Sequence, residues 1–235
     1  SLKINYAGKI SEGTHFLDME NKHENENFFV QIYAFRKHYA WLSRNFVCLT
    51  SESLWYPVSF KPYSKENNDF PLADFTKFEL LVKTSPGLMA ISQGKVHHPE
   101  KGVYIFSPQK PLPAISLLIG EYQKYSCLVD SVEYSLFARK GNEYFVPHFQ
   151  EIIDSLPHLI RELKNEYEAQ TGLKYPFERF SLAEVPAEFA LDRHIWSISS
   201  DAVQPEMVFI PEKGIFLNET DFKRTQLSQS DTGFI

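Results

Sequence analysis

Long hydrophobic runs, basic clusters and cysteines are scarce in this sequence, and each scarcity excludes a class of structure or partner. No apolar run approaches the roughly 20 residues that a helix needs to span a bilayer. Thirty acidic residues against 24 basic ones give a formal net charge of −6 without any block of like charge, so we expect no nucleic-acid partner. Only Cys48 and Cys127 occur, each within an apolar stretch, and we expect two buried, unpaired thiols.

Several catalytic and ligand-binding motifs are also missing. The sequence has no GxxxxGK phosphate loop and no GxSxG elbow. No two of its eight histidines lie four residues apart, so the paired imidazoles of a zinc-peptidase helix do not occur. Cys127 with His148 is a conceivable nucleophile and base, although any chain of this length offers such pairs by chance. We therefore expect no catalytic residue and no metal ligand in this chain.

Aromatic residues are abundant and favour a β-rich fold. They make up 15% of the chain, with 20 Phe and 12 Tyr. Short apolar runs separated by turn signals predict strands near residues 45–49, 78–82, 88–91, 103–106 and 115–119, with turns at 85–87 and 93–94. Such short strands at close spacing predict an antiparallel sandwich. One more strand is expected at residues 132–137.

After these strands the hydrophobic pattern changes from short apolar runs to helical spacing. From Phe145 to Tyr167 apolar residues recur at helical spacing, and we expect one helix or a kinked pair, with a kink or break at Pro157. Gly172 should end the helix, because glycine takes positive φ at little cost. Two short apolar runs follow at residues 180–185 and 207–210, each stopped by a proline, and both predict strands.

Four segments resemble the aminopeptidase N family of zinc metallopeptidases and stand in the order in which that family carries them. They are Trp55-Tyr56-Pro57, FTKFELLVKTSPGLMAISQGK, PLPAISLLIGEY, and Tyr175-Pro176 followed by SLAEVP. The chain is similar to a divergent, membrane-associated branch of the family. The resemblance implies a mainly β fold with an α/β part. An antiparallel β-sandwich-like domain over residues 1–125 would precede the beginning of a thermolysin-like α+β catalytic domain over 126–235, with the boundary near 121–130.

The resemblance also implies a substrate-binding segment. In the family a Gly-x-Met-Glu-Asn strand carries the glutamate that holds the free amine of the substrate. The nearest counterpart here is Gln204-Pro205-Glu206-Met207, in which glutamate precedes methionine and no glycine leads it. The resemblance thus assigns substrate binding to Gln204, Glu206, Met207 and Glu212, with the amine on Glu206 and Glu212 as second candidate. The alternative for Glu206 is an acidic residue that protects a strand edge from aggregation.

Two functional hypotheses follow from the resemblance. In the first, the chain is a piece of a longer zinc aminopeptidase-like protein, ends before the His-Glu-x-x-His helix, and shapes a peptide-binding cleft. Zinc is then expected only in the parent protein, and the partners are a peptide substrate or the remainder of the parent chain. In the second, the chain is a non-catalytic interaction domain of a membrane transporter-like assembly. We expect an extracytoplasmic location, with a cytoplasmic one as the alternative, and membrane attachment only through flanking segments.

Overall fold

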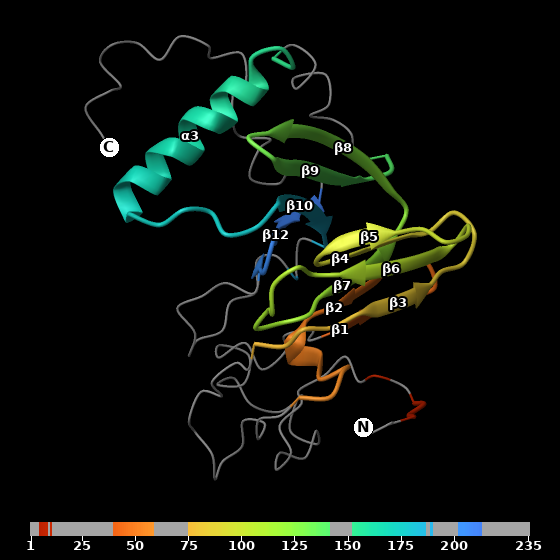
Figure 1. The fold of residues 1–235 in the computed structure, drawn as a ribbon. Helices are drawn as coiled ribbons and strands as arrows, with labels where there is room; N and C mark the ends of the chain where they lie inside the picture. The colour runs from red at the N-terminus through yellow and green to blue at the C-terminus, as the bar shows by residue number, and fades with distance from the viewer. Residues whose placement is uncertain are drawn as a thin grey trace, which may run out of the picture.

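The part of the chain that the structure describes contains three β-sheets and the helix α3, stacked in layers (Figure 1). The computed structural model describes residues 5–8, 10, 40–58, 75–141, 152–186, 189 and 202–212. Strands dominate this part of the chain, so the prediction of a mainly β fold is confirmed. The thermolysin-like character of the second part stays a prediction. Within the described residues, no helix is long and apolar enough to cross a bilayer.

Two antiparallel sheets form the sandwich. The four-stranded sheet, which we call sheet A, has the order β1-β2-β7-β4 and consists of β1 (Ala40–Leu42), β2 (Val47–Leu49), β7 (Leu117–Gly120) and β4 (Met89–Ser92). The three-stranded sheet, sheet D, has the order β3-β6-β5 and consists of β3 (Leu80–Lys83), β6 (Val103–Ser107) and β5 (Lys95–His97). A single 3-10 turn, η2 (Ser51–Ser53), follows β2.

Alternating side chains bury the faces between sheets A and D. The buried residues of this core come from six strands and are Ala40, Leu49, Val82, Ala90, Phe106 and Leu117. The predicted antiparallel sandwich is therefore present, and its strands start or end within a few residues of the predicted bounds. β5 was not predicted, because only one apolar residue, Val96, lies between Lys95 and His97.

The third sheet, sheet E, is mixed. Its order is β11-β12-β10-β9-β8, built from β8 (Tyr122–Val129), β9 (Val132–Arg139), β10 (Arg179–Val185), β11 (Val203–Gln204) and β12 (Met207–Pro211). The three central strands β9, β10 and β12 are parallel, and β8 and β11 are antiparallel at the edges. Two parallel neighbours need a long crossover connection, and helix α3 (Leu156–Thr171) lies in the one between β9 and β10.

A continuous strand occupies the region where a domain boundary was expected. β8 forms a hairpin with β9, from the pair Tyr122 and Arg139 to the pair Val129 and Val132. The division at residues 125 and 126 thus falls inside β8, whose pairing groups the whole strand with sheet E. The sequence signal was weak because β8 is an edge strand with polar residues, such as Lys124 and Ser126, between its apolar ones.

Helix α3 begins at Leu156, directly after turn residues 152–155, so the helical pattern is interrupted next to Pro157. Pro157 stands in the first turn of α3, where its missing amide hydrogen costs no helical hydrogen bond. The predicted helical positions 145–151 lie outside the described residues. The predicted end is confirmed: Gly172 has φ +69°, and its amide donates to the carbonyl of Glu168 at 2.9 Å.

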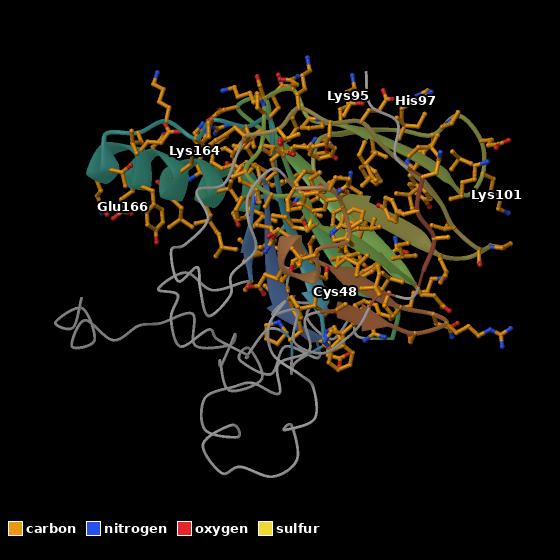
Figure 2. All side chains as sticks on the ribbon, turned by 90° about the horizontal axis from the view of Figure 1, so that it is seen from below. Cys48, Lys95, His97, Lys101, Lys164 and Glu166 are labelled. Carbon is orange, nitrogen blue, oxygen red and sulfur yellow. The ribbon has the colours of Figure 1, made fainter. Side chains whose placement is uncertain are left out.

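A second core joins sheets A and E. Five of its residues precede α3 in the sequence and are Phe46, Cys48, Ile91, Leu118 and Tyr122. The other five follow α3 and are Ala183, Val185, Phe189, Met207 and Phe209. Sheet A is therefore covered on both faces. Cys48 is fully buried and lies inside the molecule in Figure 2. Cys127 is free but only half-buried, which corrects the expectation of two buried thiols; it lies on the edge strand β8.

Candidate functional site

A tight hairpin presents the residues that the family resemblance singled out. Gln204 pairs with Met207 across β11 and β12, so Pro205 and Glu206 form the two-residue loop between them. Glu206 has φ +61°. Proline followed by a residue of positive φ is typical of a type II turn, whose third position is normally glycine. A residue with a side chain in the left-handed region costs about 1–2 kcal/mol, so Glu206 stands where local backbone preference disfavours it.

The Glu206 loop borders a cavity between the sandwich and sheet E. The cavity has a volume of about 160 Å³ and is lined by residues of β4, β5, β6, β8, β9, β10 and β12, and by Glu206 itself. Its apolar wall includes Met89, Val96, Tyr104, Phe106 and Phe137. Its charged and titratable wall includes Lys124, Glu133, Arg179, Glu206 and His98. The lining of the cavity is thus part apolar and part charged.

The carboxylate of Glu206 is fixed through one oxygen. The residue is 9% exposed, and its Oε2 accepts a hydrogen bond from the amide of Gly94 at 2.7 Å. Among the residues that the structure describes, none donates a hydrogen bond to Oε1. Burial raises the pKa of Glu206 above its ordinary value, against the Gly94 amide and the positive charge of Arg179, which lower it. A buried carboxylate with one open oxygen can therefore accept a donor from a ligand.

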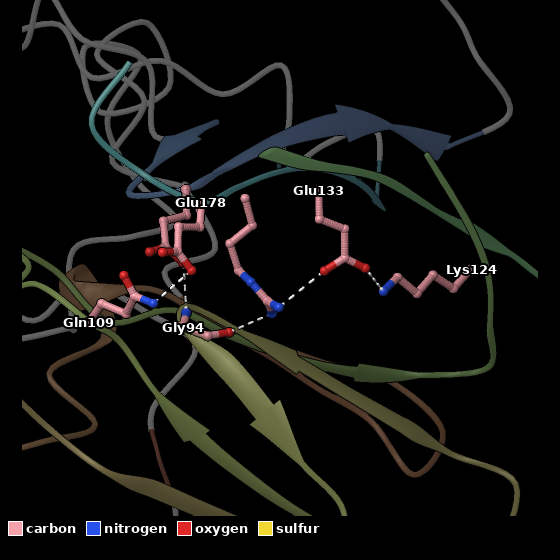
Figure 3. Close-up of polar contacts among 7 residues, drawn as sticks. Gly94, Gln109, Lys124, Glu133 and Glu178 are labelled. Atoms are coloured by element: carbon pink, nitrogen blue, oxygen red, sulfur yellow. Dashed lines mark hydrogen bonds and ion pairs between the residues drawn. The ribbon is translucent and has the colours of Figure 1, made fainter. Parts of the chain in front are cut away.

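Gly94 joins the β4–β5 turn of the sandwich to sheet E through both of its backbone polar groups. Its amide donates to Glu206, and its carbonyl accepts a hydrogen bond from Arg179 Nη1 at 2.8 Å. Gln109 Nε2 donates to Glu178 Oε2 beside this point at 2.6 Å (Figure 3). We call the three residues Gly94, Arg179 and Glu206 the Gly94 clasp. The clasp connects distant parts of the sequence, because Gly94 is 85 residues from Arg179 and 112 residues from Glu206.

The remaining charges of the cavity are paired with one another. Arg179 Nη2 contacts Glu133 Oε2 at 3.0 Å, and Lys124 Nζ pairs with the other oxygen, Oε1, of Glu133 (Figure 3). Burial acts to raise the pKa of Glu133, but the hydrogen bond to Lys124 and the charges of Lys124 and Arg179 outweigh it. The pKa of Glu133 consequently lies below its ordinary value. Both oxygens of Glu133 therefore contact cations of the chain, Lys124 and Arg179. Glu206, by contrast, has one oxygen without a donor among the described residues.

The structure brings three of the four predicted site residues together and separates the fourth. Glu206 and Met207 line the cavity, and Gln204 pairs with Met207 in the same hairpin. Met207 is 2% exposed and also belongs to the core between sheets A and E. Glu212 follows the opposite end of β12, where it pairs with Arg139 at 2.5 Å, and it does not line this cavity.

Gly94, Arg179, Glu133 and Lys124 were not predicted as site residues. The Gln93-Gly94 turn is visible in the sequence, but nothing local connects it to Arg179 or Glu206. Glu184 of β10 is a second buried carboxylate, away from the Glu206 loop. Its side chain is fully buried, and Oε2 accepts a hydrogen bond from the amide of Arg139 at 2.7 Å.

A larger apolar groove of about 850 Å³ lies on the other face of sheet E, beneath α3. Its floor includes Tyr134, Leu136, Phe180 and Leu182, and its roof includes Leu156, Ile160, Leu163 and Tyr167. Helix α3 has no buried residue, and Leu163 and Tyr167 are more than half exposed. The groove lacks the buried carboxylate that distinguishes the smaller cavity.

The described residues do not fit a metal centre. Nowhere among them do three His, Cys, Asp or Glu side chains gather closely enough to hold an ion. No protein-family model matches the sequence, and a search of curated proteins finds no match either.

Proposed function

We propose that the chain is the cleft-forming part of an aminopeptidase-like protein and that Glu206 binds the free amine of a peptide. The observation that carries the proposal is the Glu206 carboxylate, nine-tenths buried at a cavity, with Oε2 held by Gly94 and Oε1 left without a donor among the described residues. A protonated amine brings both a hydrogen-bond donor and the positive charge that a buried carboxylate lacks. The resemblance of the segment to the amine-binding strand of the aminopeptidase N family supports the same role.

The proposal is confined to amine recognition. Zinc in a parent protein stays an expectation, because the described residues do not fit a metal centre. The half of the site described here would then orient the amino terminus and the first side chain.

Calorimetric titration of the chain with L-leucinamide tests the proposal. We expect binding that is lost when the amine is blocked in N-acetyl-leucinamide. Glu206→Gln should weaken leucinamide binding about 10- to 100-fold, because a hydrogen bond to a charged group contributes about 1.5–3 kcal/mol. Glu212→Gln is the matched control, since Glu212 pairs with Arg139 away from the cavity. Weakening by Glu212→Gln alone would move the amine site to Glu212 and overturn the proposal.

A second candidate is a non-catalytic interaction domain of a membrane transporter-like assembly. It is favoured by Arg179, whose positive charge already stands near the Glu206 carboxylate and lowers its pKa. In this candidate the Gly94 clasp only joins the sandwich to sheet E, and the cavity takes no ligand. The absence of leucinamide binding to the wild-type chain, with the fold intact, would favour this second candidate.

A further inference from the structure

We propose that the groove of about 850 Å³ between α3 and sheet E binds a basic amphipathic helix of another protein. The apolar face of that helix enters the groove, and its lysines or arginines lie against acidic residues along one side of α3. The proposal goes beyond amine recognition and does not depend on Glu206, because the groove lies on the other face of sheet E from the Glu206 cavity.

Helix α3 covers the outer face of sheet E only in part. Phe180 and Leu182 of β10 form part of the floor of the groove, and Val208 of β12 lies directly opposite Leu182 in the parallel ladder. All three side chains are only half-buried, although they belong to the central strands of the sheet. Parallel strands are normally covered on both faces by helices. We therefore place the second helix beside α3, over β10 and β12.

An apolar stripe on α3 faces this space. Leu159, Leu163 and Tyr167 follow one another at intervals of one helical turn, and all three are exposed. Ile160 and Lys164, each one position further along the helix, are half-buried. The stripe is therefore rotated to one side of the contact between α3 and the sheet. Apolar residues repeated at each turn are what an amphipathic helix meets when it lies in a groove.

Two acidic residues flank the stripe on its solvent side. Glu162 follows Leu159 by three residues and Glu166 follows Leu163 by three, so the two carboxylates lie one turn apart beside the leucines. Glu162 Oε2 is 3.5 Å from Nδ1 of His158, and Glu166 Oε1 accepts a hydrogen bond from a glutamine side chain at 3.1 Å. Among the described residues, no lysine or arginine pairs with either carboxylate.

The cations of α3 lie on another side of the helix. Arg161 Nε contacts Asp130 Oδ1 at 3.0 Å, and Lys164 Nζ contacts Asp130 Oδ2 at 3.1 Å, so both are held at the turn between β8 and β9. In Figure 2 Glu166 extends away from the sheets, and Lys164 lies nearer to them. The solvent side of the stripe is therefore negative. Such a rim attracts a basic helix and repels the anionic surface of a phospholipid membrane, so the charges favour the protein partner.

Model peptides of 16 residues, the length of α3, test the proposal. One peptide carries leucine at i, i+3, i+4 and i+7 spacing with lysine elsewhere, and a second carries glutamate in place of every lysine. Fluorescence anisotropy of the labelled peptides measures their binding to the whole chain. The lysine peptide should bind about 10-fold more tightly than the glutamate peptide, and than a scrambled lysine peptide whose leucines form no single face. The preference for lysine over glutamate should disappear in 1 M salt, where the Debye length is about 3 Å.

Variants of α3 separate the apolar contribution from the charge. Leu163→Gln should weaken binding of the lysine peptide about 10-fold without a change of charge. Glu162→Lys combined with Glu166→Lys should reverse the preference in favour of the glutamate peptide. Glu79→Lys combined with Glu100→Lys alters the net charge equally at exposed positions of the sandwich, and it should leave the preference for the lysine peptide in place.

Three results would overturn the proposal. The first is no binding of the lysine peptide to the folded chain, and the second is binding that Leu163→Gln leaves unchanged. The third is sedimentation of the chain with phosphatidylglycerol vesicles that is lost in Leu163→Gln, which would assign the groove to a membrane surface. If circular dichroism shows that Leu163→Gln does not fold, the double charge reversal on α3 decides, and an unchanged preference for lysine then contradicts the proposal. Leucinamide binding through Glu206 is a separate measurement that none of these results affects.

Discussion

Glu206 combines a buried carboxylate, a left-handed backbone and an oxygen without a donor among the described residues. Two of these features cost stability: burial of a charge, and positive φ on a residue with a side chain. Departures from local preference of this kind concentrate at functional sites, because selection for packing alone would remove them. At the residue scale these features support the proposal that Glu206 binds a ligand.

The raised pKa of Glu206 predicts a specific pH dependence of stability. Because the folded-state pKa lies above the unfolded one, the ionised carboxylate destabilises the fold at neutral pH. The wild-type chain should regain this stability as pH falls through the folded-state pKa toward the unfolded value. Glu206→Gln keeps an acceptor for the Gly94 amide without the charge. We expect the variant to be more stable than wild type at pH 7 in urea denaturation, with the difference shrinking toward pH 4.5. A difference that grows on acidification would contradict the raised pKa.

How far the sequence predicts the site depends on the range of the contacts. Glu206 and Met207 were identified because they lie in one short segment that resembles a family motif. Gly94 contacts Glu206 across 112 residues and Arg179 across 85 residues. No local sequence pattern encodes contacts of such range. Glu212, five residues after the start of the strand-like run at Met207, was the second candidate for the same role. The direction of β12 places them at opposite ends.

At the scale of the element, the β4–β5 turn is where the sandwich meets the site. Gly94 has φ +88°, and a Cβ there would lie 2.3 Å from the backbone nitrogen of Pro108. Gly87 has a similar φ of +86°, but a Cβ there meets nothing within 4 Å. Gly87→Ala should cost about 1–2 kcal/mol, the penalty of positive φ alone.

Gly94→Ala should cost at least about 3 kcal/mol, since a backbone clash and disturbed hydrogen bonds to Glu206 and Arg179 add to the same penalty. Urea denaturation of the two variants measures the difference. Equal losses in Gly94→Ala and Gly87→Ala would show that the close approach to Pro108 and the Gly94 clasp contribute nothing to stability.

Helix α3 offers a second test at this scale. Pro157 lies in its first turn, where proline is well tolerated. Pro157→Ala should therefore change the free energy of unfolding by less than about 1 kcal/mol and leave helical circular dichroism unchanged. A marked gain of helical signal would mean that Pro157 interrupts a longer helix, as the sequence pattern alone had suggested.

Elements with clear alternation or turn signals were predicted well, and those without were not. Strands β4, β6, β9 and β10 carry apolar residues between recognisable turns and occur where expected. The short strand β5 and the edge strand β8 carry too many polar residues for such a signal. Edge strands face solvent on more sides, so the hydrophobic pattern that identifies central strands weakens there.

At the scale of the whole molecule, sheet A couples the two cores. It packs against sheet D through one face and against sheet E through the other. Phe209 of β12 is 2% exposed in the core between sheets A and E, so Phe209→Ala should cost about 3–5 kcal/mol. Because the two cores share sheet A, we expect this loss to shift one cooperative transition of the entire chain.

The coincidence of two probes measures that cooperativity. In a Trp196→Phe background, tryptophan fluorescence reports only on Trp41 and Trp55 beside sheet A, and far-ultraviolet circular dichroism reports on α3. Their denaturation midpoints should coincide in wild type and move together in Phe209→Ala. A fluorescence midpoint that stays in place while the circular dichroism midpoint falls would mean that the sandwich and sheet E unfold independently.

The pH dependence of leucinamide affinity tests the central claim most directly. Binding through an ionised Glu206 and a protonated α-amine requires a pH above the raised pKa of Glu206 and below the amine pKa of about 8. We therefore predict a bell-shaped affinity profile for wild type, whose acidic limb disappears in Glu206→Gln. The same profile in both proteins, or an affinity that does not change with pH, would contradict amine recognition by Glu206.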